Sequence, residues 1–292
     1  MITEKDIPPT YTLIKMGRTT IVCKDAYRTV LMEMGIGDPK RFSNGFSEPS
    51  ERYQGRGAVR TMTIPGASRE RMVIRHYRRG GKIQKFSADI YWGSSRPLLE
   101  LNIGYQALEK GIPTAEIVAA CHSQVLWFFH RGDLVSKEIA NGIDLIAYLK
   151  TLPVPLTREK ILQKRAIIEA VGKAVRKMHD AGIVHGDLHL KNIILQLNES
   201  PEIKSYIIDF DKSKATATSG DHKRYQNLMR LNRSVERYRR QGFPITRTDV
   251  LRFLLAYSHD PADSTCLLGE LSRRYKWHMR YHRLGQTLLR WF

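Results

Sequence analysis

The stretch HGDLHLKNIIL, residues 185–195, places a histidine, an aspartate and an asparagine at fixed spacing ahead of a short aliphatic run. Taken alone, it allows two ordinary interpretations. Asp and Asn favour turns, so the stretch is compatible with a polar turn between a helix and a strand. His185, Asp187 and His189 also spell H-x-D-x-H, but no downstream His or Cys group completes a metal site at the usual ligand spacing.

The residues that follow change this interpretation. After the turn-like segment NESPE, an apolar β-type run ends at Asp209 in the sequence DFD. A carboxylate at the end of a strand, shortly after H-x-D-x-x-x-x-N, is the arrangement that metal-assisted phosphoryl transfer uses. There, one aspartate orients the attacking hydroxyl, while an asparagine and a second aspartate hold Mg²⁺ against the phosphates of ATP. The spacing predicts these roles for Asp187, Asn192 and Asp209, with ATP and Mg²⁺ as cofactors, and His185 completes the predicted catalytic loop.

The length and composition are those of an ordinary globular protein. The chain has 292 residues, enough for one large domain or two lobes, and 42% of them are hydrophobic. The longest mainly apolar stretch without a charge, residues 117–130, is too short to span a bilayer. The start, MITEKDIPPT, has acidic residues and prolines where a signal peptide needs an apolar core, so we expect a cytoplasmic protein. The 3 cysteines are far apart and indicate neither a disulfide framework nor a zinc knuckle.

The charge is less ordinary, because 48 Lys and Arg residues exceed 29 Asp and Glu residues and leave a net charge of +19. An excess of this size attracts polyanions such as nucleic acid, an anionic lipid surface or a phosphorylated glycolipid. No zinc-finger, RRM or heptad pattern accompanies the charge, so nucleic acid is not an expected partner. The basic residues gather in two clusters: Arg69, Arg71, Arg75, Arg78, Arg79, Lys82 and Lys85 in one, and Arg230, Arg233, Arg237, Arg239 and Arg240 in the other.

Residues 53–77 predict two β segments separated by a PGASRE turn. Gly55 and Gly57 in the first segment are candidates for a nucleotide-binding phosphate loop, although glycines in a hairpin are more often turn residues. Arg75 in the second segment stands where a kinase usually has the lysine that binds the α and β phosphates. An arginine fork is able to bind phosphate, but an exposed strand arginine is an equally good interpretation. The cation's usual partner is a helical glutamate, and Glu100 lies near the start of a predicted helix, PLLELNIGYQALEKG, with its final glycine as the stop.

The middle of the chain predicts a hinge between two lobes. Two β runs, IVAAC with VLWFF and then DLVSKEI, precede a helix-forming segment, NGIDLIAYL. Residues 138–142 form the predicted connector, where backbone groups would hold adenine, with Glu138 and Ala140 as candidate contacts. From Thr157 to His179, apolar residues recur at helical spacing, with Thr157 as N-cap and Gly182 as the stop. The predicted catalytic loop therefore lies between a long helix and a β hairpin, facing a cleft.

These elements predict an α+β protein with a two-lobed, protein-kinase-like fold. The N-lobe is expected to be β-rich and to span residues 1–139, and the C-lobe to be mainly helical and to span residues 140–292. After DFDKSKATATSGD the chain passes into a predicted helix, KRYQNLMRLNRSVERY, without the A-P-E motif that closes a protein-kinase activation segment. This favours a hydroxyl on a non-protein substrate over a peptide. A protein Ser/Thr kinase or other small-molecule kinase, and a catalytically inactive kinase-like binding protein, remain the alternatives.

Six segments carry a family resemblance: VIRHYRRGG, ELNIGYQALEKGIPTAEIVAA, DLVSKEIANGIDL, HGDLHLKNIIL, IIDFDKSK and NLMRLNRS. Together they look like the lipopolysaccharide kinases of Gram-negative bacteria, the group of Kdo kinases and heptose kinases. The likeness covers about residues 50–235, and no motif is assigned to residues 1–50 or 240–292. It implies a protein-kinase-like fold that moves the γ-phosphate of ATP to a sugar hydroxyl of the lipid A inner core, without distinguishing Kdo from heptose.

The resemblance also implies residue roles and partners. By it, Arg75 occupies the phosphate-cation position and Glu100 is its partner. Asp187 corresponds to the catalytic base, and Asn192 and Asp209 correspond to the metal ligands. The lipid A core glycolipid and an anionic membrane surface become the expected partners. The protein would then be peripheral on the cytoplasmic face of the inner membrane.

Overall fold

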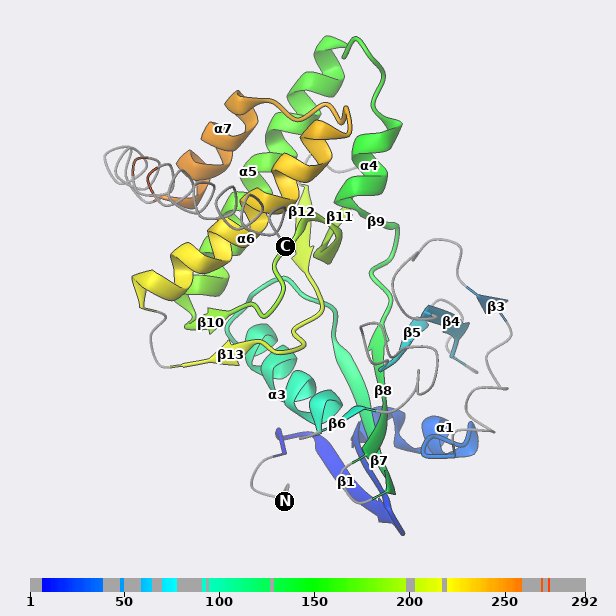
Figure 1. Cartoon of the computed structure of the whole chain (residues 1–292). Coiled ribbons are helices and arrows are strands. Elements are labelled where there is room, and N and C mark those ends of the chain that lie inside the picture. Colours follow the sequence, from blue (N-terminus) through cyan, green and yellow to red (C-terminus); the bar gives the residue numbers. More distant parts are fainter. Residues whose placement is uncertain are drawn as a thin grey trace, which may run out of the picture. The chain divides into compact units, whose positions relative to one another are not determined.

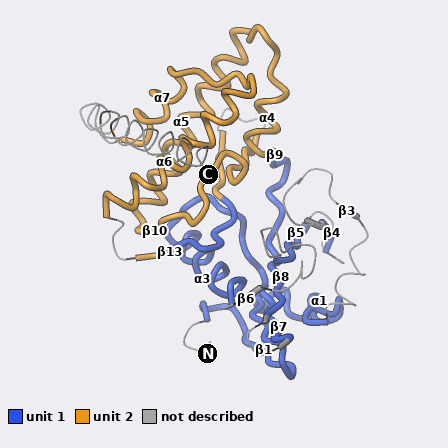
Figure 2. Tube along the Cα trace, in the orientation of Figure 1, with its two compact units in different colours: residues 1–142, 208–214 blue, residues 143–207, 215–292 orange. Residues whose placement is uncertain are grey.

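The chain forms two compact units, one of residues 1–142 with 208–214 and one of residues 143–207 with 215–292 (Figure 2). The DFD segment therefore belongs to the first unit, although it follows a strand of the second. The computed structural model describes residues 7–38, 48–49, 59–64, 70–77, 91–92, 95–126, 129–197, 203–216, 220–258, 269 and 273.

An antiparallel sheet forms the frame of the first unit. Its strand order is β1-β2-β7-β8-β5-β4-β3, and β6 also pairs with β8 (Figure 1). The strands are β1 (Tyr11–Met16), β2 (Thr19–Lys24), β3 (Glu48–Pro49), β4 (Val59–Thr63), β5 (Arg71–His76), β6 (Tyr91–Trp92), β7 (Ile117–Leu126) and β8 (Phe129–Lys137). The helices are the 3₁₀ turn η2 (Asp25–Tyr27), α1 (Arg28–Glu33) and α3 (Arg96–Glu109).

Both faces of this sheet are buried. Side chains alternate between the two faces of a strand, so Ile21 and Cys23 of β2 join one core cluster while Val22 joins the other. The first cluster includes Leu31 of α1, and the second includes Leu98 of α3. Each helix therefore covers one face of the sheet, and removing their apolar side chains from water stabilises the unit.

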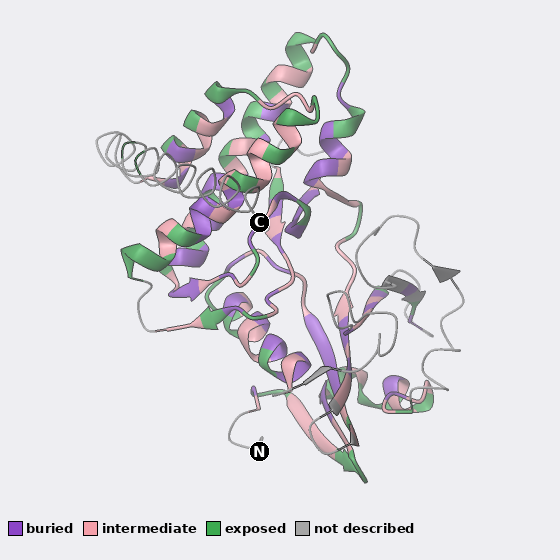
Figure 3. Cartoon of the chain, viewed as in Figure 1, coloured by how far each residue is buried: buried purple, intermediate pink, exposed green. Residues whose placement is uncertain are grey.

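Helix α3 was predicted and is confirmed. It has Pro97 in its first turn, where the missing N–H is harmless, and it ends before Gly111, whose φ is +68°. Buried and exposed residues alternate along it (Figure 3). A β-carbon at Gly104 would lie 2.6 Å from the Ile117 Cδ1 atom of β7. The glycine thus allows α3 to approach the sheet closely, with Glu100 on its buried side.

The hairpin of β7 and β8 corrects one prediction. The segment VLWFF was expected to continue the first β run, but β7 ends at Leu126 and β8 begins at Phe129 (Figure 1). The chain therefore reverses inside this apolar segment. An apolar run predicts β structure, but without Gly, Pro, Asn or Asp it carries no signal for the position of a turn.

The second unit is mainly helical. Its strands form the sheets β12-β11-β9 and β10-β13. Its elements are β9 (Gly142–Asp144), α4 (Leu145–Thr151), α5 (Arg158–Asp180), β10 (Ile183–Val184), the 3₁₀ turn η4 (Leu190–Asn192), β11 (Ile193–Gln196), β12 (Lys204–Ile207), β13 (Lys214–Ala215), α6 (Asp221–Arg240) and α7 (Arg247–Tyr257).

The long helix α5 begins and ends as predicted. The Thr157 hydroxyl accepts the backbone N–H of Lys160 at 3.3 Å, and Gly182 follows the helix with φ +79°. Apolar residues on one side of it, including Ile167 and Val175, are fully buried. Across the described ranges, no helix combines the length and apolar character that crossing a membrane needs.

Helix α7 packs on α5 through a buried ion pair and a close backbone contact. The Lys164 ammonium lies 2.8 Å from the Asp249 carboxylate and donates to the carbonyl of Pro244 at 3.0 Å. Because both charges are buried and hydrogen-bonded, the pair fixes the position of α7 on α5. Gly172 of α5 faces the carbonyl of Phe253 in α7.

We predict that Gly172→Val destabilises the second unit. A β-carbon at Gly172 would lie 2.8 Å from the Phe253 carbonyl oxygen and 2.9 Å from the Ala256 β-carbon, so the two helices must separate. The expected loss is about 1–3 kcal/mol in the free energy of unfolding, measured by urea denaturation. The matched control is Lys173→Val at the exposed neighbouring position, with an expected loss of about 0.5 kcal/mol. Equal losses in the two variants would contradict the tight α5–α7 contact.

Candidate functional site

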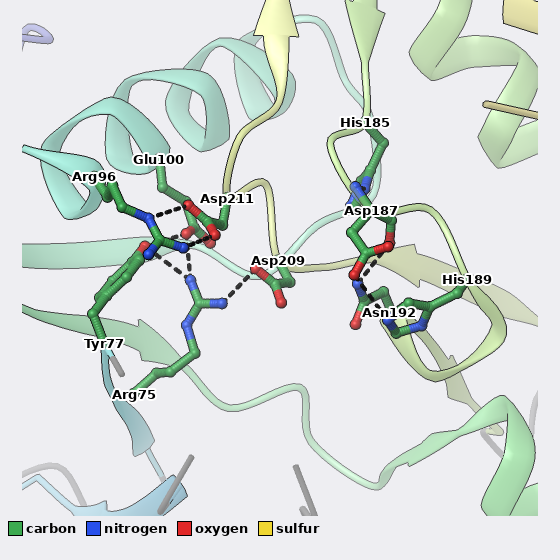
Figure 4. A network of polar contacts seen from close by, with 10 residues as sticks. All are labelled: Arg75, Tyr77, Arg96, Glu100, His185, Asp187, His189, Asn192, Asp209 and Asp211. Atoms are coloured by element: carbon green, nitrogen blue, oxygen red, sulfur yellow. Dashed lines mark hydrogen bonds and ion pairs between the residues drawn. The ribbon is translucent and has the colours of Figure 1, made fainter. Parts of the chain in front are cut away.

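Arg75 is the centre of a polar cluster in the first unit (Figure 4). It lies on β5 and uses both ends of its guanidinium. Nη1 donates to Asp209, while Nη2 donates to Glu100 and, at 3.0 Å, to the hydroxyl of Tyr77. The Arg75 side chain is 25% exposed. It is therefore a paired arginine between a helix and the DFD segment, and not a solvated strand arginine.

The charges in this cluster are set by burial and by one another. Burial raises the pKa of Glu100, which is 2% exposed, to about 7, although the neighbouring Arg75 lowers it. Burial also raises the pKa of Tyr77 well above its usual value, so its hydroxyl stays protonated and donates to Glu100. Burial by itself would lower the pKa of Arg75, but Glu100, Tyr77 and Asp209 outweigh it and raise that pKa. The guanidinium therefore keeps its positive charge.

The DFD segment is a tight turn held in the core. Asp209 has φ +68° and Lys212 has φ +60°, the left-handed region that is unfavourable for residues with side chains. The Phe210 side chain is fully buried, and its carbonyl accepts the N–H of Ser213 at 2.9 Å. These contacts turn the Asp209 carboxylate toward Arg75.

In the second unit, the HGDLHLKN loop presents one exposed carboxylate on a fixed backbone (Figure 4). The Asp187 side chain is 65% exposed, and its Oδ2 lies 3.6 Å from His189 Nε2. Its backbone N–H donates to the buried His185 Nδ1 at 3.0 Å, and its carbonyl accepts Asn192 Nδ2 at 3.0 Å. The second bond fixes the orientation of the Asn192 amide, whose carbonyl oxygen is the atom able to ligate a cation.

Helix α6 holds this loop from behind through residues that the sequence analysis missed. Asn227 accepts the backbone N–H of His185 and donates to its carbonyl, both at 2.9 Å. About two helical turns further on, on the same face, the Ser234 hydroxyl accepts the N–H of Leu190 at 3.3 Å. The feature of the sequence that points to Asn227 is its place on the buried side of a helix, next to Leu228, inside the NLMRLNRS segment. Buried polar side chains are expected to have partners, but the sequence does not say which.

A buried histidine, His179, connects Asn227 of α6 to Tyr257 of α7. Burial lowers the pKa of His179 to about 4, so the ring is neutral. Its Nε2 contacts the Asn227 oxygen at 3.2 Å, and its Nδ1 contacts the Tyr257 hydroxyl at 2.8 Å. Burial also raises the pKa of Tyr257 to about 12, so that hydroxyl is a donor. The neutral ring therefore accepts from Tyr257 and donates to Asn227.

Apart from Arg75, the predicted nucleotide contacts fall into two groups, those outside and those inside the described residues. Gly55 and Gly57 lie outside the described residues. The Glu138 backbone N–H donates to the carbonyl of Arg71 at 2.8 Å, and its carboxylate lies 3.1 Å from Arg71 Nε. Ala140 lies in the following turn, between strands β8 and β9. The backbone N–H of Glu138 is therefore already hydrogen-bonded to strand β5.

Asn227→Ala is expected to loosen the HGDLHLKN loop. The substitution leaves a buried N–H of His185 without its acceptor, a cost of about 1–3 kcal/mol. We expect amide hydrogen exchange at His185 to accelerate by about tenfold or more. Gln226→Ala, an exposed position on the same helix, serves as the control. Unchanged exchange at His185 would show that Asn227 does not hold the loop.

Comparisons with known proteins agree with this arrangement. A model of the "Lipopolysaccharide kinase (Kdo/WaaP) family" matches residues 44–257. A 3-deoxy-D-manno-octulosonic acid kinase from Vibrio vulnificus (strain YJ016) is 29% identical over 222 residues, covering 75% of this chain and 86% of that protein. One from Haemophilus influenzae (strain 86-028NP) is 35% identical over 169 residues, covering 56% of this chain and 65% of that protein.

A solved structure described as "WaaP in complex with acyl carrier protein" is also similar. It has a TM-score of 0.58 and 19% sequence identity, covering 88% of this chain and 98% of that chain. This likeness confirms the predicted α+β, protein-kinase-like fold. The family match spans Arg75 of β5, the HGDLHLKN loop and the DFD segment. From the shared fold and the extent of that match it follows that the chain belongs to the lipopolysaccharide kinase (Kdo/WaaP) family.

Proposed function

We propose that this chain is an ATP-dependent kinase that phosphorylates a hydroxyl of 3-deoxy-D-manno-octulosonic acid (Kdo) in the inner core of lipopolysaccharide. The observation that carries the proposal is the double pairing of Arg75 with Glu100 and Asp209. It assembles the cation, its helical partner and the DFD carboxylate of a kinase within one unit. Kdo is favoured over heptose because the similar Vibrio and Haemophilus proteins carry its name.

Asp187 is the proposed catalytic base. Its carboxylate would orient the attacking sugar hydroxyl and accept its proton. The exposure of this side chain on a fixed backbone supports the role, because a base must reach a substrate without moving away from it. His185 of the predicted catalytic loop is proposed as a positioning residue, since its buried ring accepts the Asp187 backbone N–H.

Arg75 is the proposed ligand of the nucleotide phosphates. Its planar fork makes bidentate contacts to phosphate oxygens, and its raised pKa keeps the charge in place. The ion pair with Glu100 limits the rotation of the side chain and so holds it ready for the nucleotide. Gly55 and Gly57 remain the predicted phosphate loop, and the segment at Glu138 and Ala140 the predicted adenine contact.

Asp209 and Asn192 are the proposed ligands of Mg²⁺. Both offer oxygen atoms, the donors that Mg²⁺ prefers, so they would hold the ion against the phosphates of ATP. A site of this kind needs no cluster of acidic or His and Cys side chains, and in the part of the chain that the structure describes no group of three or more such side chains could hold a metal. When bound, the ion neutralises charge on the phosphates during transfer.

Peripheral attachment to the cytoplasmic face of the inner membrane is the proposed location. The net charge of +19 attracts an anionic surface, and the proposed acceptor is a membrane glycolipid. Arg237 and Arg240 are exposed on α6, whereas Arg239 is paired with Glu236 at 2.8 Å. Residues 271–292 contain no acidic residue and interleave Lys and Arg with Trp, Tyr and Phe, a composition typical of interfacial segments.

The transfer reaction tests the function. The protein is incubated with ATP, Mg²⁺ and a panel of Kdo-bearing and heptose-bearing lipid A acceptors, and a mass gain of one phosphate is sought. We expect the gain on Kdo, and we expect Asp187→Asn to lower kcat by roughly 10²-fold or more while nucleotide affinity stays nearly unchanged. Asp221→Asn, at the exposed start of α6, is the control. Transfer only to heptose-bearing acceptors would show that the acceptor sugar is heptose and not Kdo. Unchanged turnover in Asp187→Asn would show that Asp187 is not the catalytic base.

Vesicle binding tests the location. Binding to vesicles of anionic lipid is expected at low ionic strength and should be largely reversed by about 0.5 M salt, where screening extends only a few ångströms. Arg237→Glu with Arg240→Glu should weaken it, because each cation near the surface contributes about 1 kcal/mol. Transfer to a soluble, delipidated acceptor should stay unchanged in this variant. Salt-resistant binding to neutral vesicles would instead indicate an inserted apolar surface.

A further inference from the structure

The third residue of the DFD motif has a partner of its own. Protein kinases have glycine at this position, in the motif D-F-G. Here Asp211 does not adopt a positive φ, so its backbone tolerates a side chain. The Asp211 carboxylate accepts a fork of two bonds from Arg96, with Nε at 3.0 Å and Nη2 on the second oxygen (Figure 4). Arg96 is the first residue of α3, so the pair ties the DFD segment to that helix.

Tyr77 connects this pair to the Arg75 cluster. The Arg96 Cζ atom lies 5.3 Å from the centre of the Tyr77 ring, and the Arg75 Cζ atom lies 4.8 Å from it. Both guanidinium groups thus contact one aromatic ring, an arrangement that is favourable for cations. The same tyrosine donates its hydroxyl to Glu100. Two Arg–Asp pairs, one at each end of the DFD motif, therefore form a single assembly with β5 and α3.

The geometry gives different roles to the Arg75–Asp209 pair and the Arg96–Asp211 pair. Asp209 sits in the left-handed region, which other contacts must maintain. Arg75 touches the Asp209 carboxylate, but under the proposed function Arg75 also binds phosphates, so that contact must be shared when the nucleotide arrives. Under that proposed function, Arg96 is assigned no contact with the nucleotide. Its fork on Asp211 holds the turn two residues away from Asp209, whatever Arg75 is doing.

We propose that the Arg96–Asp211 pair is a positioning element that keeps the Asp209 carboxylate in place to bind Mg²⁺. This inference rests on the proposed function, in which Asp209 is the metal ligand. The competing explanation is purely structural. A carboxylate near the N-terminus of α3 also stabilises that helix, and its loss would then lower stability without changing the metal site. The two explanations differ in what happens to Mg²⁺ affinity in a folded variant.

The test is a Mg²⁺ titration of the binding of a fluorescent ATP analogue, read by anisotropy, together with the thermal unfolding midpoint of each variant. In Asp211→Asn and in Arg96→Gln, we expect the Mg²⁺ concentration at half-maximal effect to rise by about tenfold, the range seen for residues that orient metal ligands. Affinity for the analogue without Mg²⁺ should stay unchanged. The charge-swapped double variant, Arg96→Asp with Asp211→Arg, should recover part of the loss.

Three further variants make the result unambiguous. Arg239→Gln removes an ion pair of α6 and should leave the titration unchanged. Arg96→Lys keeps the charge without the fork, so a folded protein with intermediate Mg²⁺ affinity is expected even if Arg96→Gln unfolds. Asp209→Ala should abolish the Mg²⁺ effect. If Asp209→Ala retains it, the metal assignment of the proposed function fails. If only the Asp209 variant responds, the positioning role of Arg96 and Asp211 is wrong.

Discussion

The first unit depends on how one guanidinium is shared. A buried carboxylate such as Glu100 costs several kcal/mol unless a cation compensates it, and Arg75 provides that cation from the neighbouring strand. The same guanidinium reaches Asp209, so one side chain links α3, the sheet and the DFD motif. Moving either element would leave a charge without its partner.

This sharing gives a physical reason for arginine where kinases usually have lysine. A lysine ammonium is a point charge on a flexible stem, whereas the guanidinium is planar and sends donors in fixed directions. Arg75 uses those directions separately: one nitrogen faces Glu100 and Tyr77, and another faces Asp209. The arginine therefore matches an environment with three acceptors.

In the second unit, neutral groups hold the loop that carries Asp187. The HGDLHLKN loop exposes the Asp187 carboxylate while hydrogen bonds hold its backbone. Asn227, backed by the neutral His179, holds the His185 peptide by hydrogen bonds that add no charge next to that carboxylate. A satisfied neutral network of this kind rigidifies the backbone at little desolvation cost. Charged groups thus hold the DFD segment in place, and neutral amide groups hold the HGDLHLKN loop.

The sequence by itself determined the features that rest on local spacing: the H-x-D-x-x-x-x-N loop, the DFD carboxylate, the capped helix α5 and, through their combination, the family. Only the tertiary structure decided which side chains support them. It also revealed β1, β2, α1 and α7 in the stretches left unassigned. Asn227 lies 42 residues from His185, and Arg96 lies 115 residues from Asp211. Periodicity and caps are written within a few neighbouring residues, whereas such pairs depend on how distant segments pack, which local pattern does not encode.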